Sequence, residues 1–200
     1  MVSALILIAD GTEEMEFTIT YDTLVRAGAS CTSAFVSSEE RQGENTYENN
    51  PPFAKGSRGI NILPDTYFSP QHATPENYDL LVIPGGANGA ETISNSSPVQ
   101  HLVREYLQAG KYVGMICAGS MTALTSGLPK QPLTSHPSVK DHLKDAFEYS
   151  EQSVVVSGKL VTSRGTAFPF ALTLVQLLFS NEKRAEVEGP MIFPPGTGLA

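Results

Sequence analysis

The chain has 200 residues, 40% of them hydrophobic, with a net charge of −8 from 13 basic and 21 acidic residues. This length fits a single domain over residues 1–200, with enough apolar residues for a core. The basic residues are few and scattered, so neither nucleic acid nor an anionic membrane surface is an expected partner. The chain has only two cysteines, which favours a reducing compartment over a secreted fold held together by disulfides.

The first third of the chain predicts a strand, a helix and a strand. Ala4–Ala9 is apolar, with no basic leader before it and no cleavage signal after it, so we interpret it as a buried strand. An amphipathic helix follows from Glu13 to Ala27, closed by Gly28, and Ser30–Val36 is a second strand. No apolar run approaches the ~20 residues of a membrane span. We expect a cytoplasmic protein, present also in the nucleus.

The middle of the chain predicts a loop and further strands. Ser38–Gly56 is polar and aperiodic, which is typical of a functional loop. Arg58–Leu63 predicts a short strand, antiparallel or at an edge, and Asp79–Pro84 a central buried strand that runs into Gly85 and Gly86.

The second half continues the alternation of strands and helices. We expect a helix over Pro98–Ala109, a strand over Tyr112–Ile116 that ends before Cys117, and a helix that starts just after Cys117. Two strands, Ser153–Val156 and Lys159–Thr162, and a closing helix, Ala167–Glu186, complete the chain's predicted elements. The alternation predicts an α/β fold with a mostly parallel sheet.

Cys117 is the first candidate for chemistry. A buried strand delivers it to a turn flanked by small residues, from which a helix starts. Such an elbow strains the backbone of a nucleophile, and a helix N-terminus lowers the pKa of a thiol there. The alternative is a small buried hydrophobic residue. The context favours a reactive, acidified thiolate.

Two further groups accompany this elbow. Gly85 and Gly86 follow a neighbouring strand, and their amides, with that of Ala118, are candidates for an oxyanion site. An ordinary turn explains the diglycine equally well. Glu16 lies in the first helix among apolar residues, so it is a candidate buried carboxyl with a raised pKa. Acidic residues also favour helix N-termini because of the helix dipole, and this explanation is sufficient for Glu13 and Glu14.

His136 precedes a proline and adds a candidate base for the cysteine. The other three histidines, His72, His101 and His142, have polar or helical surroundings that are typical of the surface. The histidines and cysteines show no metal-ligand spacing, so we expect no metal and no cofactor.

Five segments together resemble the DJ-1/PfpI superfamily, and within it the DJ-1 branch, which has fungal and bacterial relatives. They occur in order along nearly the whole chain: Ala4–Glu16, Ile83–Gly86, Ile116–Gly119, Thr134–Pro137 and Thr162–Gly165. The resemblance implies a flavodoxin-like three-layer α/β/α sandwich and a homodimer, with Arg26 near the dimer surface.

The resemblance also implies roles for individual residues. Cys117 becomes the nucleophile and redox-sensitive thiol, Glu16 its protonated partner and His136 a third member. Gly86 and Ala118 would supply oxyanion amides, and Arg58 and Arg164 would lie near the pocket. The implied activity is of the glyoxalase III type (a D-lactate dehydratase), with a protein deglycase side activity and a role in oxidative stress.

The sequence departs from the family at several positions. Ser120 stands where close relatives often have proline, which predicts a looser turn. Leu63 replaces a second cysteine of the human relative, the Ser38–Gly56 loop is long, and His136 has no acidic partner nearby. The last departure argues against a peptidase triad.

We therefore expect cofactor-free conversion of small 2-oxoaldehydes to 2-hydroxy acids through a Cys117 hemithioacetal, with Glu16 and His136 moving a proton. The alternative is a redox-sensing, chaperone-like stress protein that acts through oxidation of Cys117 without turnover. A peptidase and a flavodoxin-like binding module rank below these.

Overall fold

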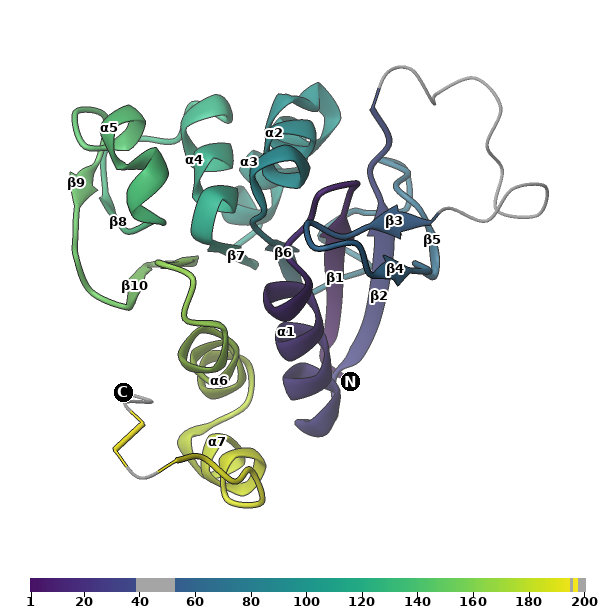
Figure 1. The fold of residues 1–200 in the computed structure, drawn as a ribbon, viewed down its shortest axis with the longest axis vertical. Coiled ribbons are helices and arrows are strands. Elements are labelled where there is room, and N and C mark those ends of the chain that lie inside the picture. The colour runs from purple at the N-terminus through teal and green to yellow at the C-terminus, as the bar shows by residue number, and fades with distance from the viewer. Residues whose placement is uncertain (39–52, 195, 198–200) are drawn as a thin grey trace.

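The structure is a computed structural model that describes residues 1–38, 53–194 and 196–197. Seven strands form one sheet in the order β10-β11-β7-β6-β1-β2-β5 (Figure 1). Their bounds are β1 Ser3–Ile8, β2 Ser30–Phe35, β5 Thr66–Tyr67, β6 Leu80–Ile83, β7 Tyr112–Ile116, β10 Val154–Ser157 and β11 Leu160–Ser163. All neighbours are parallel except β10 and β11. The predicted central position of β6 is confirmed.

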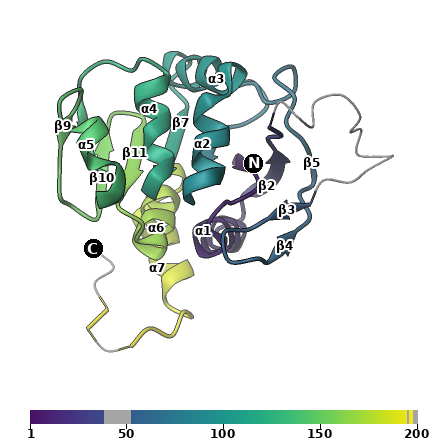
Figure 2. The ribbon, with the colours of Figure 1, turned by 45° about the horizontal axis from the view of Figure 1, so that its top comes forward.

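Helices cover both faces of this sheet (Figure 2). One face carries α1 Glu14–Arg26, α6 Ala167–Leu178 and α7 Asn181–Glu188. The other carries α2 Ala87–Asn95, α3 Ser97–Gln108, α4 Met121–Thr125 and α5 Lys140–Leu143. The predicted three-layer, flavodoxin-like α/β fold is confirmed. None of the described helices combines the length and apolar composition needed to cross a membrane.

The sequence of β1 explains why this strand lies in the middle. Leu5 and Leu7 pack into one core cluster, and Ala4, Ile6 and Ile8 into the other. Side chains of a strand alternate between its two faces, so a strand that is covered on both sides is apolar throughout.

Two small strand pairs complete the described fold. β3 Ala54–Lys55 pairs antiparallel with β4 Asn61–Ile62, and β8 Pro132–Leu133 pairs parallel with β9 Glu148–Tyr149. The strand expected at Arg58–Leu63 is therefore only Asn61–Ile62, and it is antiparallel. Most of the expected Ser38–Gly56 loop, residues 39–52, lies outside the described residues.

Two helix predictions need correction. The closing helix expected over Ala167–Glu186 is two helices, because the chain turns at Phe179 and Ser180. The side chain of Ser180 accepts a hydrogen bond from the N–H of Lys183 and so caps α7. The helix α2 after Gly86 was not predicted from the sequence. The described helix after Cys117 is a 3-10 turn, Cys117–Ser120, followed by the short α4.

The strand order positions a site. β1, β6 and β7 are adjacent and parallel, so their carboxyl ends meet at one edge of the sheet. In open α/β sheets this edge is where ligands bind.

Candidate active site

Cys117 follows β7 directly and has a strained backbone. Its φ of 62° makes it the only non-glycine residue with positive φ in the described part of the chain. Such a conformation costs roughly 1–3 kcal/mol and persists where the surrounding structure enforces it, often at functional sites. The predicted elbow is confirmed.

Glycines make this elbow sterically feasible. A Cβ on Gly119 would lie 2.6 Å from the Ile83 carbonyl oxygen, so the turn after Cys117 packs directly on the end of β6. Gly86 has a φ of 86°, and a Cβ there would lie 2.1 Å from the Gly11 carbonyl oxygen. The loops after β1, β6 and β7 thus contact one another through backbone, which leaves no room for side chains.

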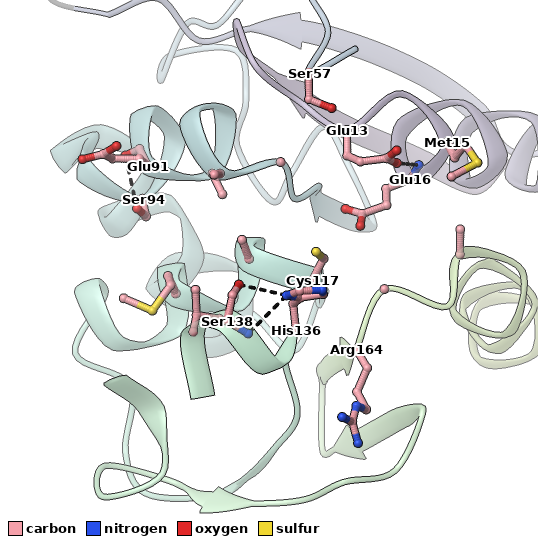
Figure 3. Close-up of a pocket in the computed structure, with 18 of the residues that line it drawn as sticks. Glu13, Met15, Glu16, Ser57, Glu91, Ser94, Cys117, His136, Ser138 and Arg164 are labelled. Carbon is pink, nitrogen blue, oxygen red and sulfur yellow. Dashed lines mark hydrogen bonds between the residues drawn. The ribbon is translucent and has the colours of Figure 1, made fainter. Parts of the chain in front are cut away.

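Glu16 brings a buried carboxyl to the sulfur. Glu16 is only 5% exposed and its carboxylate accepts the N–H of Gly85 at 2.7 Å. In Figure 3 this carboxylate lies on the side of the Cys117 sulfur, with which it interacts. Glu13 caps α1 by accepting the N–H of Glu16 at 2.8 Å, as its position at the helix start predicts. The predicted inward position of Glu16 is confirmed.

The expectation for Gly85 needs correction. Its N–H is donated to Glu16, and its carbonyl oxygen accepts the N–H of Glu13 at 3.1 Å. Gly85 therefore fixes the carboxyl and does not offer its N–H to an oxyanion. The N–H groups of Gly86 and Ala118 instead point at the Cys117 sulfur.

Burial dominates the electrostatics of the pair. It raises the pKa of Glu16 to about 7, although hydrogen bonds from Cys117 and Gly85 oppose this rise. Burial also raises the pKa of Cys117 to about 12, and the charge of an ionised Glu16 adds to the rise, while the N–H groups of Ala118 and Gly86 lower it. The sequence predicted that a helix terminus would lower the pKa of this thiol, whereas burial and the neighbouring Glu16 carboxyl raise it. Whether a thiolate forms depends on whether Glu16 keeps its proton.

His136 lies close to the elbow, and none of the acidic side chains in the described part of the chain pairs with it. Its backbone N–H donates to the carbonyl oxygen of Cys117 at 3.3 Å, and its exposed ring lines the same cavity as the sulfur. Its Nδ1 accepts the N–H of Ser138 at 3.2 Å and lies 2.8 Å from the Ser138 hydroxyl. The neutral ring therefore carries its proton on Nε2.

The two predicted arginines both line the cavity, with different surroundings. The guanidinium of Arg164 donates to the carboxylate and carbonyl oxygens of Glu151, and in Figure 3 it points away from Cys117. The guanidinium of Arg58 donates to the Ser57 carbonyl oxygen at 3.3 Å, and no carboxylate of the described residues lies within ion-pair distance of it. Arg58 therefore lines the cavity with a guanidinium that no described carboxylate binds.

The cavity around these groups has a volume of about 1050 Å³. Cys117, Glu16, Gly86 and Ala118 all line it. Gly165 lies beside the pair, and even a Cβ there would remain 3.9 Å from the Cys117 sulfur. In the part of the chain that the structure describes, no three His, Cys, Asp or Glu side chains converge as metal ligands would.

Sequence reasoning missed several residues that build this site. Glu14 is buried and binds the turn that carries Ser57 and Arg58. Ser120, expected to loosen the elbow, donates its hydroxyl to the Thr134 carbonyl oxygen at 2.9 Å and ties the elbow to the segment before His136. These partners are far apart in the sequence, so no local signal indicates them.

Comparisons with known proteins agree with this geometry. The sequence model described as the DJ-1/PfpI family matches residues 2–177. The "Glutathione-independent glyoxalase DJ-1" of Schizosaccharomyces pombe is 35% identical, over 97% of this chain and 100% of its own length. The "Glutathione-independent glyoxalase DJR-1.2" of Caenorhabditis elegans is 31% identical, over 94% and 95%.

Solved structures show the same fold. The crystal structure of Drosophila melanogaster DJ-1beta superposes with a TM-score of 0.83 at 36% identity, covering 94% of this chain and 96% of that one. Schizosaccharomyces pombe DJ-1 gives a TM-score of 0.84 at 34% identity, covering 96% and 100%.

Proposed function

Because the chain belongs to the DJ-1/PfpI family, in its DJ-1 branch, and sets a thiol against a buried carboxyl, we propose that it is a glutathione-independent glyoxalase. Its substrates would be methylglyoxal and glyoxal, and its products lactate and glycolate. Relatives that are 31% and 35% identical bear the name of this activity.

One observation carries the proposal: Cys117 and Glu16 are hydrogen-bonded to each other at the edge of an open cavity, and burial raises the pKa of both groups. The pair can therefore hold one proton in two arrangements. With the proton on Glu16 the sulfur is a nucleophile, and with the proton on sulfur the carboxylate is a base.

The reaction needs both arrangements in turn. The Cys117 thiolate attacks the aldehyde carbon, and the carbonyl oxygen takes up a proton to give a hemithioacetal. Glu16 then removes the hydrogen of that carbon as a proton and returns a proton to the neighbouring carbon through an enediol. The product is a thioester, which water hydrolyses to the 2-hydroxy acid and free thiol. The aldehyde carbon is oxidised and the ketone carbon reduced, so no external oxidant is needed.

The remaining site residues stabilise charge on oxygen. The N–H groups of Gly86 and Ala118 already face the sulfur and are the donors nearest to the oxyanion that its attack creates. The His136 ring offers a donor at Nε2, and Arg58 offers a cation to the carbonyl oxygens and to the carboxylate product. Arg164 takes a supporting place at the rim, because Glu151 already binds its guanidinium.

The wider setting follows from the family and is part of the proposal. We infer a homodimer that uses α1, on which Met15 is 65% exposed and Val25 46% exposed. The two free cysteines suit the reducing cytoplasm or nucleus. A deglycase side activity would use the same hemithioacetal chemistry.

The direct test is lactate formation from methylglyoxal without glutathione. We expect turnover by the wild type and by Cys31→Ala, which removes the other thiol, but loss of turnover in Cys117→Ala and Glu16→Gln. An inactive wild type with an intact thiol that oxidises readily would reject the enzyme and favour the redox sensor. Activity retained in Cys117→Ala would reject the assigned nucleophile.

A further inference from the structure

Glu14 is a buried carboxylate that the proposed chemistry does not use. It lies in the first turn of α1, two residues before Glu16, and only 6% of it is exposed. It accepts the Ser57 hydroxyl at 2.9 Å and the backbone N–H of Arg58 at 2.6 Å. Both carboxylate oxygens are thus occupied by the turn between β3 and β4.

The turn is shaped around this carboxylate. A Cβ on Gly56 would lie 2.4 Å from the Glu14 Oε1, so only glycine leaves room for it. Backbone hydrogen bonds anchor the chain on the near side of the turn, where the N–H of Ser57 donates to Thr12 at 2.8 Å. Beyond Ser57, the N–H of Arg58 is held by Glu14.

The same turn forms one wall of the cavity. Ser57 and Arg58 line it together with Cys117, and Arg58 provides the guanidinium that no described carboxylate pairs with. The position of this cation relative to the sulfur therefore depends on the backbone of residue 58, which Glu14 holds.

We propose that Glu14 is a positioning residue that holds the 56–60 turn so that Arg58 faces the substrate. The inference rests on the proposed function, since it assigns a binding role to Arg58 in that reaction. Glu14 does not touch the reacting atoms and acts through Arg58.

The charge of Glu14 is suited to this role. Burial raises its pKa, but the hydrogen bonds from Arg58, from its own backbone and from Ser57 outweigh burial and lower the pKa below the ordinary value. The side chain is therefore ionised at neutral pH and can only accept. Glu14→Gln keeps the size of the side chain but replaces one accepting oxygen with a donor that faces Ser57 or Arg58.

A double-mutant cycle tests the proposal. A charge-assisted contact is worth ~1.5–3 kcal/mol, so Glu14→Gln and Arg58→Ala should each raise KM for methylglyoxal about tenfold or more, with kcat nearly unchanged. The double variant should show no further rise, because the two residues act in series. Additive effects, or a fall in kcat with unchanged KM, would overturn the inference.

A matched control separates positioning from general stability. Asp65 holds another loop in the same way, accepting the Ser33 N–H at 2.8 Å and the Ser33 hydroxyl at 2.7 Å, but it does not line the cavity. Asp65→Asn should lower the melting temperature without changing KM. An equal rise in KM in this variant would mean that Glu14 has no specific role.

A second readout does not depend on turnover. Trypsin should cut after Arg58 about tenfold faster or more in Glu14→Gln than in the wild type, because the N–H of residue 58 loses a charge-assisted hydrogen bond. Cleavage after the exposed Lys130 should stay unchanged. Equal cleavage after Arg58 in both proteins would show that Glu14 does not hold the turn, and would overturn the inference. If the wild type has no glyoxalase activity but Glu14→Gln is still cut faster, only the proposed reaction is rejected.

Discussion

Cys117 and Glu16 form a unit whose behaviour neither residue has alone. Burial opposes ionisation of both, and each is hydrogen-bonded to the other. A negative charge on Glu16 disfavours the thiolate, whereas a proton on Glu16 can be donated to it. The reactivity of the sulfur therefore reflects the protonation of its partner more than the helix that follows it.

Glu16 should reduce the stability of the protein at neutral and higher pH. Its pKa is raised from 4.5 to about 7, so the folded state binds this proton more tightly than the unfolded state. The stabilisation is complete below pH 4.5 and is lost as the pH rises through 7. Glu16→Gln does not titrate, so it should gain up to about 3 kcal/mol relative to the wild type between these limits. Urea unfolding at pH 4.5 and 8 measures the gain, and a pH-independent difference would contradict the assignment.

Gly85 should be irreplaceable for activity. A Cβ there would lie 2.5 Å from the Glu16 Oε2 and 2.7 Å from the Cys117 Cβ, so Gly85→Ala pushes the pair apart. Misplacement of reacting groups by ~1 Å costs on the order of 100-fold in rate, and kcat/KM should fall by this amount. Gly127→Ala meets nothing within 4 Å and should lose some stability but keep its turnover. Normal activity of Gly85→Ala would show that the pair tolerates displacement.

At this scale the sequence predicts residues that lie at strand ends and misses those paired across loops. Cys117 was identifiable because it follows a buried strand directly, and Glu16 because it lies among apolar residues in the first helix. The contact of Glu14 with Ser57 spans 43 residues and that of Arg164 with Glu151 spans 13, with no local pattern in either. For the thiol pKa, the sequence shows a helix start after Cys117 but not the depth of its burial, and burial is the largest cause of the raised pKa.

Among the elements, apolar strands were predicted well and short polar helices poorly. β7 was predicted with its bounds, since Tyr112–Ile116 is a continuous apolar run between turns. α2, Ala87–Asn95, is short, consists mainly of small and polar residues, and begins directly after the diglycine that was equally well explained as an ordinary turn. The break between α6 and α7 was missed, although Ser180 is a residue that often caps helices.

Packing between β7 and α6 should outweigh strand propensity. Gly114 lies in β7, where a Cβ would come within 2.9 Å of the Phe170 ring and 3.4 Å of Leu174. Gly114→Val supplies a residue that strands favour, yet we expect a loss of about 1–3 kcal/mol in the free energy of unfolding from overpacking. Urea midpoints measure it, with Thr32→Val in the half-buried part of β2 as the control. A stabilised Gly114→Val would show that α6 can move away.

At the scale of the whole molecule, the order of the strands in the sheet brings the site residues together, which amino-acid composition cannot predict. The site draws on the ends of β1, β6, β7 and β11, which are contiguous in the sheet only in the order 1-6-7-11. The sequence predicts the parallel sheet, and the family resemblance predicts which loops meet. Neither a charge of −8 nor a hydrophobic content of 40% would have done so.

The proposed homodimer should be visible as a mass twice the 21.4 kDa of one chain in light scattering. Met15→Glu adds a charge to the exposed apolar part of α1 and should shift the mass toward the monomer, because burying an unpaired charge at an interface is costly. Asp22→Glu, which keeps the surface charge on the same helix, is the control. A monomeric wild type at micromolar concentration would contradict the proposed assembly.

The most direct measurement of the central claim is the position of hydrogen in the product. Methylglyoxal would be converted without glutathione in D2O, and the lactate examined by NMR. If Cys117 holds the substrate while Glu16 moves a proton through an enediol, lactate should carry deuterium at C2, and Cys117→Ala should form none. Lactate that forms equally with Cys117→Ala, or equally with Glu16→Gln, would contradict the account.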